Sequence, residues 1–215
     1  MLFLDKKGVL MKQITHYQLG LHLADQYIRS RSPIVREAFL LGCTQPDQNP
    51  FTYMKGSLRN QWLRGHNWKN SRRYIRKLIK RLENKKSLNI LDFYTIGKLI
   101  HYLSDAFTFA HNDSFPGNLQ DHRQYESQLH AYVLKSISNG TNPSLPKRET
   151  LFCSVRAAHQ AYCRRNHNLE ADAKFICNVT AAVIANLLLS YEENSSIILQ
   201  MSTKKACNLK FTVIY

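Results

Sequence analysis

The sequence predicts an all-α fold, organised as a single-domain bundle of several helices. Apolar residues recur at helical spacing along most of the chain, and the stretches between them are short and rich in Pro, Gly, Asn and Ser. The length of 215 residues suits one domain that buries a substantial core without disulfide support.

The first two helices are predicted from their capping signals. Thr15 can cap a helix that runs to about residue 29, and Pro33 suits the first turn of a second helix that stops near Gly42. Two prolines with Asn and Asp then predict a loop over 43–50, which would present Asp47 on irregular backbone. Further helices are expected at 69–83, 91–110, 119–136, 148–164 and 169–191.

The helical domain is expected to cover residues 1–201, and residues 202–215 are expected to form a tail whose role the sequence does not reveal. The last six residues alternate like a strand, but one short strand has no partner. The longest apolar run, 181–189, is far shorter than the roughly 20 residues that a membrane span requires. No transmembrane segment is therefore expected.

The cellular location is predicted from the first residues and from the cysteines. Charge appears at Asp5, too early for the apolar stretch of a secretory signal. The five cysteines show no C-x-x-C spacing, and their odd number favours free thiols in a reducing compartment over a disulfide framework. We therefore expect a cytoplasmic protein.

The chain is strongly basic, with 30 Lys and Arg against 15 Asp and Glu. The resulting net charge of +15 attracts polyanions such as nucleic acid, anionic lipid or a phosphorylated substrate. Residues 69–86 contain nine cationic residues and one acid, together with apolar residues at helical spacing. This segment is predicted to be an amphipathic basic helix, whose outer face is either simply solvated or docks an anionic membrane or RNA. The apolar positions are Tyr74, Ile75, Leu78, Ile79 and Leu82.

Histidines and acids cluster in the middle of the chain. His101 and Asp105 are four residues apart, as are His122 and Glu126, and His111 lies between the two pairs. Residues four apart share one face of a helix, so each pair can reach one ion. Roughly 0.6 such pairs are expected by chance, and here two occur in tandem. Imidazole with carboxylate suits zinc, and fewer than four protein ligands leave a position for water, as hydrolytic zinc requires.

The order and spacing of these five residues resemble the zinc-dependent phospholipase C family, whose fold is shared with the fungal single-strand-specific zinc nucleases. Upstream positions agree in order. His16 resembles the family's early His, Asp47 its loop Asp, and His66 the His that precedes a further helix. The resemblance covers residues 16–126.

The resemblance implies a cluster of two or three zinc ions. The residues that match the first ion's ligands are Asp47, His66, His101 and Asp105. Those that match the second ion's ligands are His111, His122 and Glu126, with Asp105 as the bridge between the two ions.

A third ion in the secreted relatives uses the early His, the bridging Asp and the processed amino terminus. In this chain fifteen residues precede His16, and translation from Met11 would make His16 the sixth residue. Binding of the third ion would therefore depend on which methionine begins the chain.

The implied chemistry is hydrolysis of a phosphodiester by zinc-activated water in an in-line attack on phosphorus. Asp47 is the expected general base. Gln48 stands where the phosphatidylcholine-cleaving relatives carry an aromatic residue, so a preference for choline is not expected. The positive charge favours an acidic phospholipid or nucleic acid as substrate. Three functions stay open: a phospholipase C-like phosphodiesterase, a nuclease or nucleotidase on the same scaffold, and a non-catalytic protein that binds metal or nucleic acid.

Overall fold

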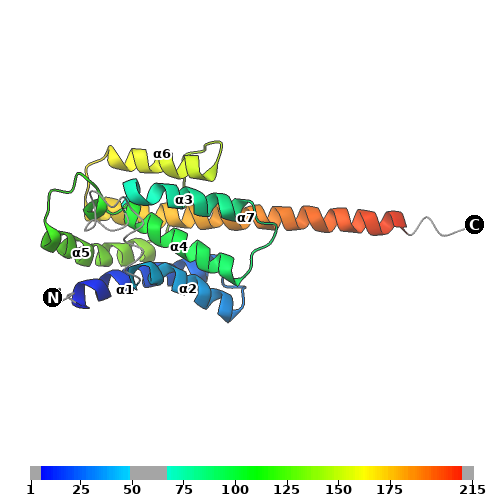
Figure 1. The fold of residues 1–215 in the computed structure, drawn as a ribbon, viewed down its shortest axis with the longest axis horizontal. Helices are drawn as coiled ribbons and strands as arrows, with labels where there is room; N and C mark the ends of the chain where they lie inside the picture. The colour runs from blue at the N-terminus through cyan, green and yellow to red at the C-terminus, as the bar shows by residue number, and fades with distance from the viewer. Residues whose placement is uncertain (1–5, 49–66, 210–215) are drawn as a thin grey trace, which may run out of the picture.

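A computed structural model describes residues 6–48 and 67–209, and every regular element within these ranges is a helix. The predicted all-α class is confirmed. Figure 1 shows the helices packed side by side, with α7 running through the bundle and past its end. The elements are α1 (Lys6–Tyr27), α2 (Pro33–Gln48), α3 (Trp68–Glu83), α4 (Ile90–Ala106), the 3-10 turn η2 (Phe109–His111), α5 (Leu119–Ser138), α6 (Leu151–Cys163) and α7 (Leu169–Leu209).

Three predicted boundaries are wrong. Thr15 does not cap α1, because that helix begins at Lys6 and passes through it. α2 continues through Pro46, so Asp47 lies in its last turn and not on a loop. Here tertiary packing overrides the local proline signal, since α2 makes a more extensive contact with α4 than any other pair of described helices makes. α4 ends at Ala106, earlier than predicted, and a separate 3-10 turn follows.

Two glycines allow α2 and α4 to touch backbone to backbone. A Cβ atom on Gly42 would lie 2.2 Å from the carbonyl oxygen of Tyr94, and one on Gly97 would lie 2.1 Å from that of Phe39. Neither distance leaves room for a side chain. The crossing therefore depends on both glycines, and it brings the end of α2 against the second half of α4.

Reciprocal capping boxes begin the two helices that carry the clustered histidines. The side chain of Asn89 accepts a hydrogen bond from the Asp92 N–H, and the Asp92 carboxylate accepts one from the Asn89 N–H. Asn118 and Asp121 begin α5 in the same way. The two pairs therefore occupy the last two turns of α4 (His101, Asp105) and the first two turns of α5 (His122, Glu126), while His111 lies on η2 between them.

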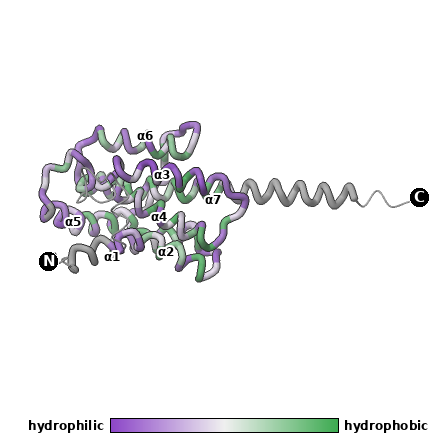
Figure 2. Tube along the Cα trace, viewed as in Figure 1, coloured by the Kyte–Doolittle hydropathy of each residue, from purple (hydrophilic) through white to green (hydrophobic). Residues whose placement is uncertain are grey.

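Helix α3 is amphipathic, as predicted. Its apolar residues Ile75, Leu78, Ile79 and Leu82 are buried in the core, and Tyr74 packs against it. Figure 2 shows that α3 is largely hydrophilic along its length. Core packing is thus established for one face of this helix.

Helix α7 contributes a long stretch of the core. By length and composition Leu169–Tyr191 could cross a membrane, but 56% of its most apolar window is buried inside the bundle, as in an ordinary core helix. The helix continues without a break through residues 201 and 202, the predicted edge of the domain. Residues 210–215, which carry the strand-like pattern, lie outside the described residues, and the predicted division into domain and tail stays a prediction.

Candidate metal centre

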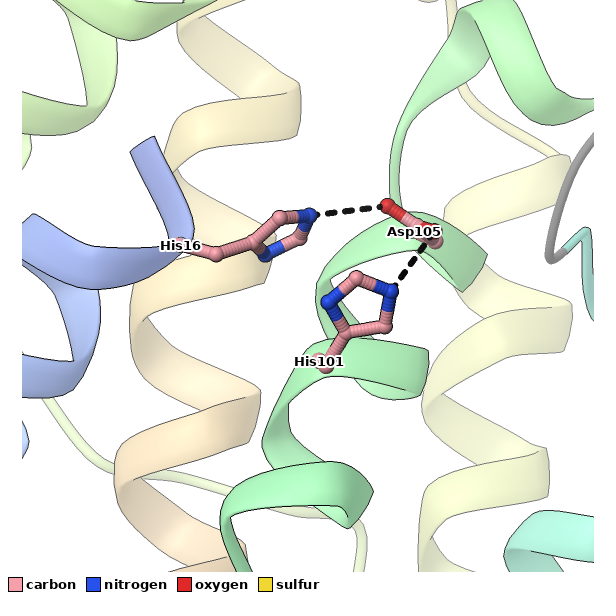
Figure 3. A group of neighbouring side chains, drawn as sticks. All are labelled: His16, His101 and Asp105. Carbon is pink, nitrogen blue, oxygen red and sulfur yellow. Dashed lines mark ion pairs between the residues drawn. The ribbon is translucent and has the colours of Figure 1, made fainter. Parts of the chain in front are cut away.

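Four side chains converge where α1, α2 and α4 meet. His16 comes from α1, Asp47 from the end of α2, and His101 and Asp105 from α4. His16 Nε2 lies 3.2 Å from Asp105 Oδ1, and His101 Nε2 lies 3.5 Å from Asp105 Oδ2 (Figure 3). Asp47 faces both rings, with its Oδ2 3.7 Å from His16 Nε2 and its Oδ1 3.6 Å from His101 Nε2. We call these four residues the first group.

The ring of His101 is oriented by the neighbouring helix. Its Nδ1 lies 2.9 Å from the carbonyl oxygen of Cys43, which follows Gly42 at the close crossing of α2 and α4. Because a carbonyl oxygen can only accept, Nδ1 donates this hydrogen bond, and Nε2 is the ring atom that faces Asp47 and Asp105. A histidine that ligates a metal is commonly held in this way through its second nitrogen.

A second group lies between η2 and α5. His111 Nε2 is 2.9 Å from Glu126 Oε1, and His122 Nδ1 is 3.7 Å from Glu126 Oε2. The rings of His111 and His122 stand edge to face with their centroids 4.8 Å apart. We call His111, His122 and Glu126 the second group.

Asp105 lies between the two groups. The same Oδ1 atom that approaches His16 is 3.7 Å from His111 Nε2, while Oδ2 faces His101. One carboxylate is therefore within reach of ions held in either group. This is the geometry that a bridging ligand needs.

The residues of both groups fit a zinc ion. His16, His101 and Asp105 each present one donor atom, and these atoms lie within 4.8 Å of one another; the same holds for His111, His122 and Glu126. Imidazole nitrogen and carboxylate oxygen are ordinary zinc ligands. Asp105 and Asp47 are also buried, and buried carboxylates are stable only when a cation or several donors compensate their charge.

Comparison with known proteins agrees with this geometry. The family model described as zinc-dependent phospholipase C matches residues 15–176. The chain belongs to the zinc-dependent phospholipase C family. No curated protein and no solved structure matched. The family resemblance inferred from the histidine and acid spacing is therefore confirmed, and the match extends well beyond Glu126 into α7.

Seven of the eight predicted zinc ligands lie among the described residues. His66 lies outside the described residues, and the other seven lie in the two groups. His16, which the resemblance ties to a third ion, contacts Asp105, the predicted bridge. Helical backbone precedes His16 from Lys6 onward. That these residues ligate zinc stays a prediction.

Three contacts that support the two groups were not predicted from the sequence. The Cys43 carbonyl depends on the paired glycines of α2 and α4. His130 Nδ1 lies 2.9 Å from Thr15 Oγ1 and so joins α5 to α1 beside His16. Asp172, on α7, is buried next to the second group and accepts three hydrogen bonds. In each case the partners are far apart in the sequence.

Proposed function

We propose that this protein is a zinc-dependent phosphodiesterase of the phospholipase C type that carries two or three zinc ions. The observation that carries the proposal is Asp105, one buried carboxylate placed between two histidine-containing groups. Zinc bound there would lower the pKa of a bound water and would stabilise the negative charge that develops during in-line attack on phosphorus. The residues of the chain would hold the ions and accept the proton that the attacking water releases.

Asp47 is the proposed general base. Its two carboxylate oxygens face His16 and His101, so it lies at the edge of the first group where a water would be deprotonated. Its place in the last turn of α2, packed against α4, holds it more rigidly than a loop would. A carboxylate in this position can either ligate or accept a proton, and the Asp47→Asn variant separates the two roles by zinc content.

A cavity beside the second group offers a place for substrate. It has a volume of about 250 Å³ and lies between the start of α3 and the segment after η2. Its lining includes Trp68, Lys69, His111 and His159. An aromatic ring and a cation next to a metal-binding histidine suit a phosphate ester that carries an organic group.

We further propose that the substrate is an anionic phospholipid presented at a membrane surface. Arg72, Arg73, Arg76, Lys77 and Lys80 are exposed on α3. Within the described residues none of these five forms an ion pair, whereas Lys69 lies 3.7 Å from Asp113. A row of unpaired cations on a helix fixed to the core attracts anionic headgroups. Because α3 begins at the cavity, this row would bring that surface close to the second group.

A nuclease or nucleotidase is the second candidate, and the same cationic row favours it. Nucleic acid binding commonly adds exposed aromatic rings that stack on bases. On α3 the aromatic residue among the cations, Tyr74, packs instead against Tyr102, with ring centroids 5.1 Å apart. This contact favours a lipid surface over single-stranded nucleic acid.

Elemental analysis with a hydrolysis assay tests the activity. We expect two or three zinc ions per chain, diester hydrolysis that chelation abolishes and added zinc restores, and faster cleavage of phosphatidylglycerol than of phosphatidylcholine. An Asp47→Asn protein that keeps its zinc but loses hydrolysis would support the general base. Cleavage of single-stranded DNA or RNA with no cleavage of lipid would select the nuclease, and a chain that hydrolyses neither would overturn both.

Vesicle binding tests the role of α3. Replacing Arg72, Arg73 and Lys77 by Gln is expected to weaken binding to phosphatidylglycerol vesicles about a hundredfold. A matched control removes the same charge from other exposed positions, Arg29, Lys135 and Arg164. Equal weakening by both triple variants would show that net charge, and not the α3 face, controls membrane binding.

A further inference from the structure

Asp172 is a fully buried acid that belongs to neither ligand group. It lies in the first turn of α7, and its side chain has no exposed surface. Its Oδ2 accepts hydrogen bonds from the Phe109 backbone N–H at 2.6 Å and from the Tyr125 hydroxyl at 2.9 Å. Its Oδ1 accepts one from the Tyr162 hydroxyl at 2.9 Å. One carboxylate thus joins α5, α6 and α7 to η2.

Each of these partners lies near a residue of the second group or bonds to a neighbour of one. Phe109 begins η2, two residues before His111. Tyr125 directly precedes Glu126 on α5. The Tyr162 hydroxyl also accepts a weak hydrogen bond, at 3.4 Å, from the side chain of Asn112, which follows His111. The network therefore holds the backbone on both sides of His111.

The short turn η2 needs an anchor of this kind. It has only three residues, and Thr108, which precedes it, makes no side-chain cap. The Phe109 N–H is instead satisfied by Asp172, 63 residues away. A charged acceptor makes a stronger hydrogen bond than a neutral one. Asp172 on α7 thus helps to fix the turn that carries His111, in addition to the turn's own hydrogen bond from the His111 N–H to the Thr108 carbonyl oxygen.

Burial raises the pKa of Asp172 to about 6, against the opposing effect of the hydrogen bonds from Phe109, Tyr162 and Tyr125. An isolated carboxylate in this place would be costly, and three donors reduce that cost.

We propose that Asp172 is a positioning residue that holds the second group at the spacing a zinc ion requires. The inference rests on the proposed function, in that the second group is taken to bind zinc. Asp172 acts through the Phe109 N–H, which places His111, and through Tyr125, which fixes the turn of α5 that carries His122 and Glu126. The hydrogen bonds that Asp172 accepts come from η2, α5 and α6, whereas the first group is built on α1, α2 and α4.

Zinc affinity measured ion by ion tests the proposal. Asp172→Asn keeps the shape but replaces one acceptor oxygen by a donor, which opposes the N–H and hydroxyl donors. We expect the ion of the second group to be lost to a chromophoric chelator at about 10- to 100-fold lower chelator concentration, with the other ion held as in the unchanged chain. Cobalt substitution is expected to show an altered visible spectrum for one of the two sites.

Asp92→Asn is the matched control. Asp92 is equally buried, but it lies in the capping box of α4, nine residues before His101. We expect this variant to lower thermal stability without a selective loss of one ion. If Asp172→Asn does not fold, Tyr162→Phe removes a single hydroxyl and is expected to weaken the same ion to a smaller degree.

The outcomes separate the two claims. An unchanged chain that binds no zinc would overturn the proposed function and this inference together. A chain that binds two or more ions, and whose Asp172→Asn or Tyr162→Phe variant holds them all as tightly as before, would overturn only the positioning role. Equal weakening of every ion, or the same selective loss in Asp92→Asn, would reduce Asp172 to a stability residue and would also overturn it.

Discussion

The two ligand groups are built in different ways. The first group lies on long helices that cross at Gly42 and Gly97, and its members are almost fully buried, with His101 at 0% and Asp105 at 2% exposure. The second group lies on a three-residue turn and the start of α5, and His122 and Glu126 are 16% and 13% exposed. The first group thus lies on close-packed helices, whereas residues beside the second group, Phe109 and Tyr125, are hydrogen-bonded to Asp172.

This difference predicts that the two groups bind zinc with different affinities. A site fixed by close-packed backbone changes little, because interiors resist deformation. A site on a short turn, partly open to solvent, is where substrate can enter and where an ion is more easily lost. We therefore expect the first group to hold its zinc more tightly than the second.

The largest effect is expected from Asp105→Asn, which removes the contact between the groups. One carboxylate faces His16, His101 and His111, so its loss should weaken both ions at once. Zinc content should fall by at least one ion and hydrolysis should drop to the level of the chelated protein. Elemental analysis checks this, and a variant with full zinc content would refute the bridging role.

Gly97→Ala should damage the first group alone. The added Cβ would lie 2.1 Å from the Phe39 carbonyl oxygen, which forces α2 away from α4 and breaks the Cys43 contact with His101. We expect a loss of about 3 kcal/mol in the free energy of unfolding and weaker binding of the tighter ion.

Gly20→Ala is the control for this variant. Its Cβ would meet the Cys43 sulfur at 3.1 Å, a contact that a side chain can relieve. Chemical denaturation of the two metal-free variants gives the comparison. Similar stability of both would show that the α2 and α4 crossing tolerates a side chain.

His122→Ala should damage the second group alone. The ring is partly exposed, so its removal should cost less stability than a core substitution does. We expect the loss of one zinc ion, retention of the other, and a large fall in hydrolysis. Loss of both ions in this variant would contradict the independence of the two groups.

The stability of the protein at acid pH should depend on His159, which contacts the end of α4, where the two groups meet. His159 donates from Nε2 to the carbonyl oxygen of Ala106, and burial lowers the pKa of His159 from 6.5 to about 4, with His167 adding to the shift and the Ala106 contact opposing it. The unfolded chain therefore binds more protons between pH 6.5 and 4, so stability is lost as the pH falls through this range.

The His159 contribution should reach about 3 kcal/mol. Denaturation of metal-free protein at pH 7 and pH 4 measures it, since zinc loss would otherwise add to the effect. His159→Gln should show a smaller difference between the two pH values than the unchanged chain. An identical difference would assign the acid sensitivity to other groups.

The sequence could predict much of this arrangement where spacing along one helix decides it. The pairs four residues apart lie together as predicted, with His101 Nε2 3.5 Å from Asp105 and His122 Nδ1 3.7 Å from Glu126. The helical backbone of Asp47 could not be predicted, because Pro46 is a local signal for a loop, whereas α2 continues through Pro46 and packs against α4. Asp172 lies 63 residues from Phe109, and no local pattern relates two such residues.

The smallest effect is expected from His130→Ala, which lies near the first group without belonging to it. Its Nδ1 pairs with Thr15 Oγ1, next to His16 on α1, and this partly buried contact should contribute about 1 kcal/mol to stability. Zinc content and hydrolysis should stay close to those of the unchanged chain, because His16 is carried by a helix that α2 and α5 already hold in place. A marked loss of zinc in His130→Ala would mean that the first group, like the second, depends on side-chain support and that the contrast between them fails.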